Sequence, residues 1–122
     1  MCGISAVLET DKDQALDPAA LAGMHEVLRH RGPDGEAFLR VNSDLTALRG
    51  DSLACLSQGQ PARLAAGFHW LRIMDLGAES MQPLASADGR LWILFNGEIY
   101  NFRDLREELR THGHRFRTDS DH

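Results

Sequence analysis

The chain begins Met1-Cys2-Gly3-Ile4, which places a thiol next to its first residue. Removal of the initiator methionine would leave Cys2 with both a thiol and a free α-amine. An α-amine titrates near ~8 and can take up the thiol proton directly or through one water molecule, while Gly3 lets a substrate come close. Together these groups can form a cysteine nucleophile that carries its own base. A Met-Cys start also occurs without a catalytic role, so the rest of the chain must decide.

A second pair of groups, Asn96 and Gly97, follows the most hydrophobic run of the chain, residues 91–95. The run predicts a central strand. A side-chain amide and a glycine N–H at the end of a rigid strand can donate hydrogen bonds to an oxyanion. Asn-Gly is equally common as a hairpin turn, and this alternative stays open. The helical pattern that follows favours the oxyanion interpretation.

Residues 29–36 form a cationic segment with the sequence Arg-His-Arg-Gly-Pro-Asp-Gly-Glu. One interpretation is a helix exit, because basic residues in a last turn favour the helix dipole and Pro-Asp-Gly is a turn sequence. The other is a tight loop, held by Gly32 and Gly35, whose cationic groups and Asp34 support a neighbouring site. The residues alone favour neither.

Arg72 lies in a predicted strand over residues 68–75. Alternation places it on one face with Trp70 and Met74, and places Leu71 and Ile73 on the other. An arginine between two large apolar side chains could bind a carboxylate. An exposed arginine on an edge strand explains the pattern equally well.

Strands and a helix are predicted around these groups in the first half of the chain. Residues 4–8 predict a buried strand with Cys2 at its leading end, and residues 37–41 predict another. Residues 42–62 predict an exposed hairpin or a long loop, in which Cys55 is a small buried hydrophobe. The helix between the two strands begins at an Asp17 N-cap and Pro18, and its apolar face comprises Leu21, Met24 and Leu28.

The last elements predicted are a helix and the start of a strand. Asn101 caps the helix and Gly113 ends it, and a further strand begins near residue 115. The side chains expected to face the core from this helix are Phe102, Leu105 and Leu109.

Composition limits the kind of protein. A chain of 122 residues with 43% hydrophobic and 25% charged residues is typical of one globular domain. A net charge of -5 argues against nucleic-acid and anionic-membrane partners. No apolar run is long enough to span a membrane and no signal peptide is recognised. Two cysteines make no disulfide framework, which suits the cytoplasm. The spacing of His112, His114 and His122 predicts no metal site.

Several segments together resemble the N-terminal glutaminase domain of glutamine-dependent asparagine synthetases. They are Met-Cys-Gly-Ile at the start, Arg-His-Arg-Gly-Pro-Asp-Gly at 29–35, Asp-Leu at 75–76, Gln-Pro at 82–83, Asn-Gly-Glu-Ile-Tyr-Asn at 96–101 and Thr-Asp-Ser-Asp at 118–121. Those domains are class II glutamine amidotransferases of the N-terminal-nucleophile superfamily. The resemblance implies an α+β fold, a four-layer αββα sandwich, with residues 1–122 forming the N-terminal part of one such domain.

The resemblance also implies roles for individual residues. Cys2 would attack the side-chain amide of glutamine, giving a thioester and ammonia. Asn96 and Gly97 match the oxyanion-hole pair. Glu98 matches a residue that lines the substrate pocket, and Asp121 matches the carboxylate that holds the substrate α-ammonium group.

The chain departs from the family at the arginine that pairs with the substrate α-carboxylate. Trp70 occupies that position, while Leu71, Ile73 and Met74 fit the remaining pocket positions. Arg72 lies two residues on, about 6 to 7 Å along a strand, and is the candidate to replace the missing cation.

A second departure is length. The family's ATP-dependent synthetase domain is absent, and no Ser-Gly-Gly-x-Asp loop occurs. We therefore expect no cofactor in this chain, with ATP and Mg²⁺ bound only by the missing synthetase domain, which would be the partner that receives the ammonia. A homodimer is left open. The alternative to a glutaminase is a binding or regulatory domain of the same fold that lost activity with the arginine.

Overall fold

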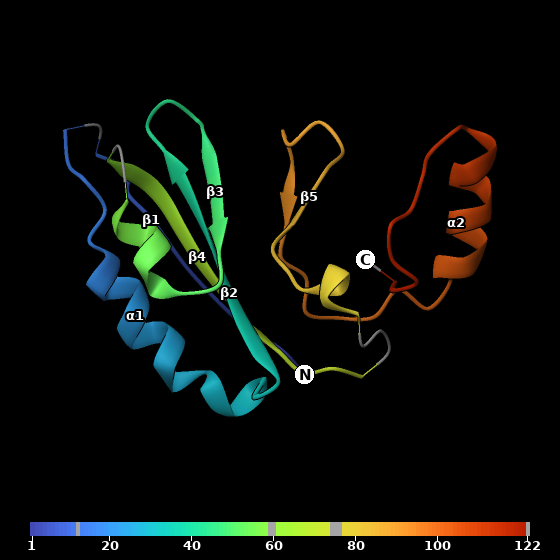
Figure 1. Ribbon diagram of the computed structural model, residues 1–122, viewed down its shortest axis with the longest axis horizontal. Helices are drawn as coiled ribbons and strands as arrows, with labels where there is room; N and C mark the ends of the chain where they lie inside the picture. The colour runs from blue at the N-terminus through green and yellow to red at the C-terminus, as the bar shows by residue number, and fades with distance from the viewer. Residues whose placement is uncertain (12, 59–60, 74–76, 122) are drawn as a thin grey trace.

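The computed structural model describes residues 1–11, 13–58, 61–73 and 77–121. Its elements confirm an α+β fold with two sheets and two α-helices. Figure 1 shows them in the order α1, four-stranded sheet, β5–β6 hairpin and α2 across the molecule. None of the described helices is both long and apolar enough to cross a membrane.

The larger sheet carries the N-terminal residues. It contains β1 (Gly3–Leu8), β4 (Ala62–Trp70), β2 (Gly35–Asn42) and β3 (Ala47–Gly50), in that order and with antiparallel neighbours. Gly3 pairs with His69 and Gly35 pairs with Trp70, so the start of β1 lies at the end of β4. The predicted strands at 4–8 and 37–41 are thereby confirmed. In 42–62, where an exposed hairpin or a long loop was expected, Ala47–Gly50 form β3, whose hairpin partner β2 lies almost wholly before this segment.

Helix α1 (Pro18–Val27) covers one face of this sheet. It begins as predicted, because the Asp17 carboxylate accepts the Ala19 N–H at 2.9 Å and Pro18 occupies the first turn. The predicted apolar face is only partly buried. Leu21 is fully buried, whereas Met24 is 48% exposed and His25 takes the inner position.

The main core lies between α1, the sheet and the 3₁₀ helix η2 (Leu53–Ser57). Burial of these side chains removes apolar surface from water and so stabilises this half of the structure. Cys55 is partly buried and packs against the core, as expected, and burial raises the pKa of its thiol. The buried residues are Leu16, Leu21, Phe38, Leu56, Ala62 and Ala65.

Two strand predictions were wrong. The strand expected over 68–75 ends at Trp70, where β4 stops pairing with its neighbours, and Met74 and Asp75 lie outside the described residues. The run at 91–95 is no central strand. Its only paired residues form β6 (Trp92–Ile93), which pairs with β5 (Leu84–Ala85). Apolar runs do not reveal where strand pairing ends.

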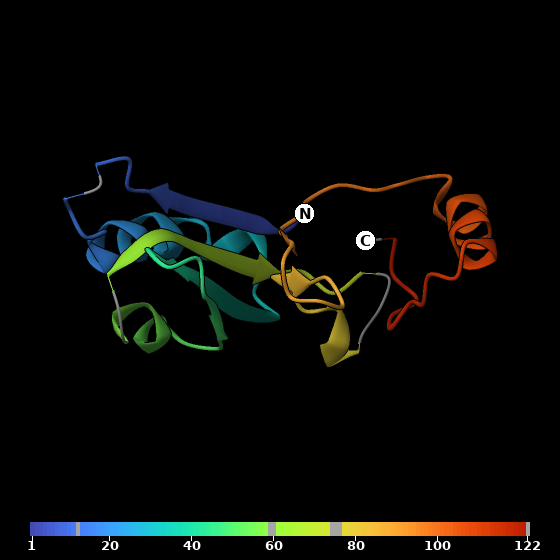
Figure 2. The same cartoon turned by 90° about the horizontal axis from the view of Figure 1, so that it is seen from above.

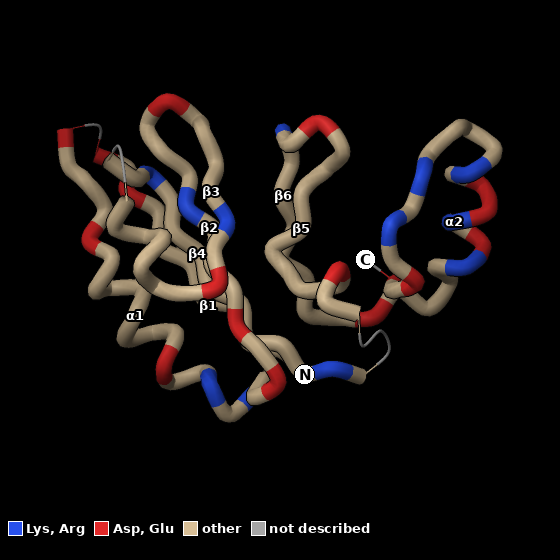
Figure 3. The backbone as a smooth tube through the Cα atoms, in the orientation of Figure 1, with Lys and Arg blue, Asp and Glu red and all other residues tan. Residues whose placement is uncertain are grey.

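Helix α2 (Phe102–Thr111) is largely solvated. Figure 2 shows it beyond the hairpin, away from the four-stranded sheet, and Figure 3 shows its many charged residues. Leu105 and Leu109 are each 40% exposed, so the prediction that this face enters the core was wrong. Asn101 precedes the helix without a side-chain cap hydrogen bond, and residues 115–118 form no strand.

Candidate active site

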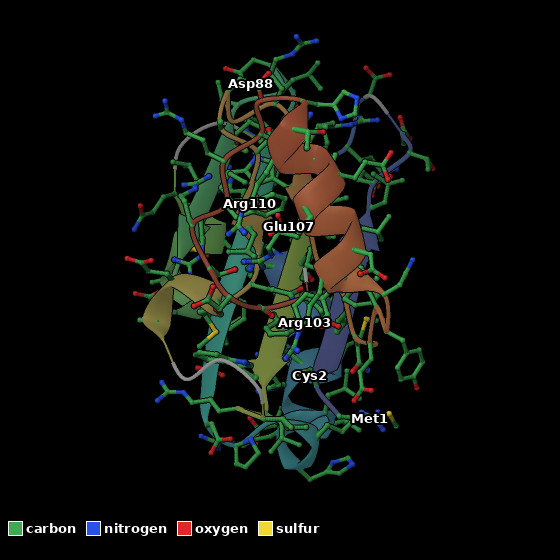
Figure 4. All side chains as sticks on the ribbon, turned by 90° about the vertical axis from the view of Figure 1, so that its right-hand side faces the viewer. Met1, Cys2, Asp88, Arg103, Glu107 and Arg110 are labelled. Atoms are coloured by element: carbon green, nitrogen blue, oxygen red, sulfur yellow. The ribbon has the colours of Figure 1, made fainter. Side chains whose placement is uncertain are left out.

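A cavity of about 120 Å³ lies where the start and the last described residues of the chain meet. The wall includes Met1 at one side and Ser120 at another. Figure 4 shows Met1 and Cys2 together, with α2 toward the viewer. The predicted site residues that line this cavity are Cys2, Leu71, Ile73, Asn96, Gly97, Glu98 and Asp121. Met74, also predicted, lies outside the described residues.

The Cys2 thiol is held against the backbone just beyond β4. Its Sγ accepts the Leu71 N–H at 3.4 Å and lies 3.9 Å from the Leu71 carbonyl oxygen. This contact follows from the sheet, because pairing of Gly3 with His69 brings Cys2 beside the residues that follow Trp70. The candidate nucleophile is therefore half-buried, in a fixed position and open to the cavity.

The main-chain carbonyl of Cys2 receives two further hydrogen bonds. Arg31 Nε donates to it at 3.1 Å, and Asn96 Nδ2 donates at 3.0 Å. The Asn96 amide carries two N–H groups, so one remains for another acceptor. The two predicted chemical groups, Cys2 and Asn96, thus meet although they are 94 residues apart.

The cationic segment 29–35 supports this site, as the second of the two interpretations expected. Arg31 reaches Cys2, and the Asp34 carboxylate accepts the Arg72 N–H at 2.9 Å. Gly32 lies so close to β4 that an added Cβ would be 2.4 Å from the His69 carbonyl carbon. A side chain there would push the loop away from the strand that positions Cys2.

Gln82 is a positioning residue that the sequence did not reveal. Its buried amide donates to the Phe95 carbonyl at 3.0 Å and accepts the Phe95 N–H. This pair of hydrogen bonds holds the backbone immediately before Asn96. Sequence patterns identified Gln82-Pro83 only as a turn and a family motif, because the contact spans 13 residues.

One end of the cavity is acidic. Glu98 and Asp121 both line it, and Asp121 Oδ2 accepts the Ile99 N–H at 2.7 Å. That bond ties the last described residues of the chain to the Asn-Gly-Glu-Ile segment. Two carboxylates at this end suit a positively charged ligand group.

Arg72 is placed differently from its neighbours. Its guanidinium lies 4.6 Å from the centre of the Trp70 ring, and the residue is exposed rather than part of the cavity wall. Trp70 itself lines the cavity and is 5% exposed. No described residue of the wall has a basic side chain.

Comparisons with known proteins agree with these features. A family model described as "Glutamine amidotransferase domain" matches residues 43–122. The chain is 34% identical to asparagine synthetase [glutamine-hydrolyzing] 1 of Bacillus subtilis, 32% to a putative one of Methanocaldococcus jannaschii and 37% to a probable one of Schizosaccharomyces pombe. Each alignment covers 99% of this chain but only 16%, 21% and 18% of the respective relative. No solved structure matches the chain significantly.

Proposed function

The chain belongs to the glutamine amidotransferase domain family, and on that premise we propose that its cavity hydrolyses glutamine to glutamate and ammonia with Cys2 as the nucleophile. The observation that carries the proposal is the hydrogen bond from Asn96 Nδ2 to the Cys2 carbonyl. It brings an amide donor to the residue that bears the thiol, inside a cavity that also has a carboxylate end.

The reaction begins when the Cys2 thiol passes its proton to the α-amine of the same residue and Sγ attacks the side-chain amide carbon of glutamine. Negative charge develops on the amide oxygen, where the free N–H of Asn96 and the Gly97 N–H donate hydrogen bonds. The carbon–nitrogen bond then breaks and ammonia leaves with a proton from the α-ammonium group of Cys2. Water attacks the carbonyl carbon of the resulting thioester and the same amine takes the water proton. The carbon–sulfur bond then breaks, glutamate is released, and the sulfur takes the proton back from the amine.

The remaining cavity residues bind the rest of the substrate in this proposal. Glu98 and Asp121 hold the α-ammonium group of glutamine at the acidic end. Leu71 and Ile73 contact its aliphatic part. Arg72 would pair with the α-carboxylate, for which its guanidinium must leave the Trp70 ring.

The order of layers supports a finer assignment of the fold. We propose an N-terminal-nucleophile αββα sandwich, because α1, the four-stranded sheet, the β5–β6 hairpin and α2 follow one another in that order (Figure 1). A nucleophile at the leading end of a strand agrees with such a fold.

The relatives suggest the wider setting. They are named glutamine-hydrolysing asparagine synthetases, and the chain spans about a fifth or less of their length. We propose that ammonia from this cavity passes to an ATP-dependent synthetase domain, which would bind ATP and Mg²⁺ itself. Glutamate release from glutamine, measured on the full-length protein, tests the proposal.

Retention of Met1 is expected to abolish the reaction even though the thiol is intact. The α-amine of Cys2 would then be a peptide nitrogen and could not take up a proton, and Met1 would remain in the cavity wall. Intact-mass analysis of preparations with different degrees of processing should show activity proportional to the fraction that lacks Met1. Full activity with Met1 attached would contradict the mechanism.

Arg72→Ala is expected to weaken glutamine binding by about 1.5 to 3 kcal/mol, the loss typical of a hydrogen bond to a charged group. The measurement is the glutamine dissociation constant in an inactive Cys2→Ala background. Arg63→Ala is a matched control, because that arginine bonds the carbonyls of Asp11 and Thr10, outside the cavity wall.

The reciprocal change, Trp70→Arg, restores the cation that the family carries at this position. If Arg72 already binds the α-carboxylate, Trp70→Arg should raise glutaminase activity little. One observation favours the alternative of an impaired binding domain. Trp70 lines the cavity, and none of the described residues that line it has a basic side chain. A silent Arg72→Ala together with no gain from Trp70→Arg would support that alternative.

A further inference from the structure

A second group of polar side chains lies on the α1 face of the sheet. Phe68 and Trp70 line the cavity, so His69 between them points to the opposite face. There it stacks on His25 of α1, with ring centres 3.6 Å apart and 11° between the planes. Glu36 of β2 is the direct cross-strand neighbour of His69. Both histidines are at least 97% buried, at 3% and 2% exposure, whereas the Glu36 side chain is 44% exposed.

The hydrogen bonds define which ring nitrogens are available. His69 Nε2 lies 2.8 Å from the His25 carbonyl oxygen, which can only accept, so Nε2 carries a proton. Neutral His69 therefore presents a lone pair at Nδ1. His25 Nδ1 contacts Ser5 Oγ at 3.2 Å, while its Nε2 is buried and makes no hydrogen bond within the described part of the chain.

Both available nitrogens lie near one carboxylate oxygen. Glu36 Oε2 lies 3.3 Å from His25 Nε2 and 4.0 Å from His69 Nδ1, and the ligand atoms of the three side chains all lie within 4.8 Å of one another. We propose that His25 Nε2, His69 Nδ1 and Glu36 form a binding site for one divalent transition-metal ion of the zinc class.

The shorter of the two nitrogen–oxygen distances to Glu36 suits such an ion. Tetrahedral bonds of about 2.0 to 2.1 Å separate ligand atoms by about 3.3 Å, which the His25–Glu36 pair already has. The His69–Glu36 pair must close from 4.0 Å, and the two rings must open from their stack so that both lone pairs reach one ion. The exposed Glu36 side leaves room for water as a fourth ligand.

The surroundings also suit metal ligation. Ligating histidines usually donate their second N–H to a carbonyl or another oxygen, as His69 does to the His25 carbonyl and as His25 can do to Ser5. Gly67 leaves space for the His25 ring, since an added Cβ would lie 2.5 Å from Nδ1. Burial, and after it the nearby His69, lower the pKa of His25, although Glu36 acts in the opposite direction.

The ion would connect three elements, α1, β2 and β4, behind the strand that carries Cys2. Gly3 pairs with His69, so the site lies next to the nucleophile in the sheet but on the other face. Its role is structural, because no atom of the three side chains lines the cavity. Residues 25, 36 and 69 are too dispersed for sequence spacing to have predicted it.

The test is Co²⁺ titration of the full-length protein followed by visible absorption, with Zn²⁺ competition. A Cys2→Ala background removes the N-terminal thiol, which could bind either metal, and makes the result independent of glutaminase activity. We expect one equivalent of Co²⁺ with a tetrahedral spectrum without thiolate charge-transfer bands, displaced by Zn²⁺, and a higher melting temperature with either ion.

Glu36→Gln is the deciding variant, because it keeps the shape of a partly exposed side chain while removing the carboxylate. We expect it to weaken Co²⁺ binding by at least about tenfold. Glu26→Gln is the matched control, since Glu26 is an exposed carboxylate of α1 that pairs with Arg29. Absence of a one-equivalent Co²⁺ spectrum, or equal binding by Glu36→Gln and the parent, would overturn the proposal.

Discussion

Cys2→Ala is expected to abolish glutamate release from glutamine while the protein remains folded. The substitution removes the only thiol that lines the cavity among the described residues, and with it the atom that would form the thioester. The structural cost is small, because the hydrogen bonds of Sγ go only to the Leu71 main chain, and the one from the Leu71 N–H is worth about 1 kcal/mol. Steady-state glutamate release and a thermal melt, measured on the same preparation, separate the two effects.

Cys55→Ala is the control that the chain itself offers. Cys55 is a second free cysteine of similar burial, but it packs against the core between α1 and the sheet and lies outside the cavity wall. Burial raises the pKa of the Cys55 thiol, which disfavours its reactive thiolate form. This variant is expected to retain activity. Comparable residual activity in Cys2→Ala would require another nucleophile and would remove the basis of the proposed mechanism.

The parts of the fold that could be predicted from the sequence depend on local chemistry. Asp17 and Pro18 start α1 through interactions within one turn, so their residue types suffice. The same holds for residues 4–8, whose apolar run became β1. Strand ends depend instead on partners elsewhere in the chain. The run at 91–95 pairs only at Trp92 and Ile93, and no local property of that run specifies this.

The candidate site shows the same division. The order of the family motifs was enough to predict that Cys2, Asn96 and Asp121 share one site, and all three line the same cavity. The alternation of side chains along a strand did not predict the position of Arg72. β4 ends at Trp70, and the Arg72 guanidinium lies over the Trp70 ring. His25 was missed since helical periodicity counts apolar residues, and its inner position is stabilised by Ser5 and His69 rather than by hydrophobicity.

Asn96→Ala is expected to lower kcat by about a hundredfold or more with little change in KM. An oxyanion donor acts mainly on the charge that develops in the transition state, so loss of one donor typically lowers kcat by about a hundredfold or more and leaves substrate binding little changed. The structure adds a second consequence, because Asn96 also bonds the Cys2 carbonyl, which Arg31 would then hold alone among the described side chains. The measurement is steady-state kinetics of glutamate release.

Two further variants separate these contributions. Asn96→Asp keeps the shape of the side chain but replaces its amide donor with a carboxylate. It therefore loses the hydrogen bonds to the Cys2 carbonyl and to the oxyanion, and it places negative charge beside the developing oxyanion. We expect kcat to fall at least as far as in Asn96→Ala. Asn101→Ala is the control, because Asn101 is exposed, makes no cap hydrogen bond and lies outside the cavity wall. A change in KM alone at position 96 would mean that the amide binds only the ground state, and the oxyanion role would have to be assigned to the Gly97 N–H without Asn96.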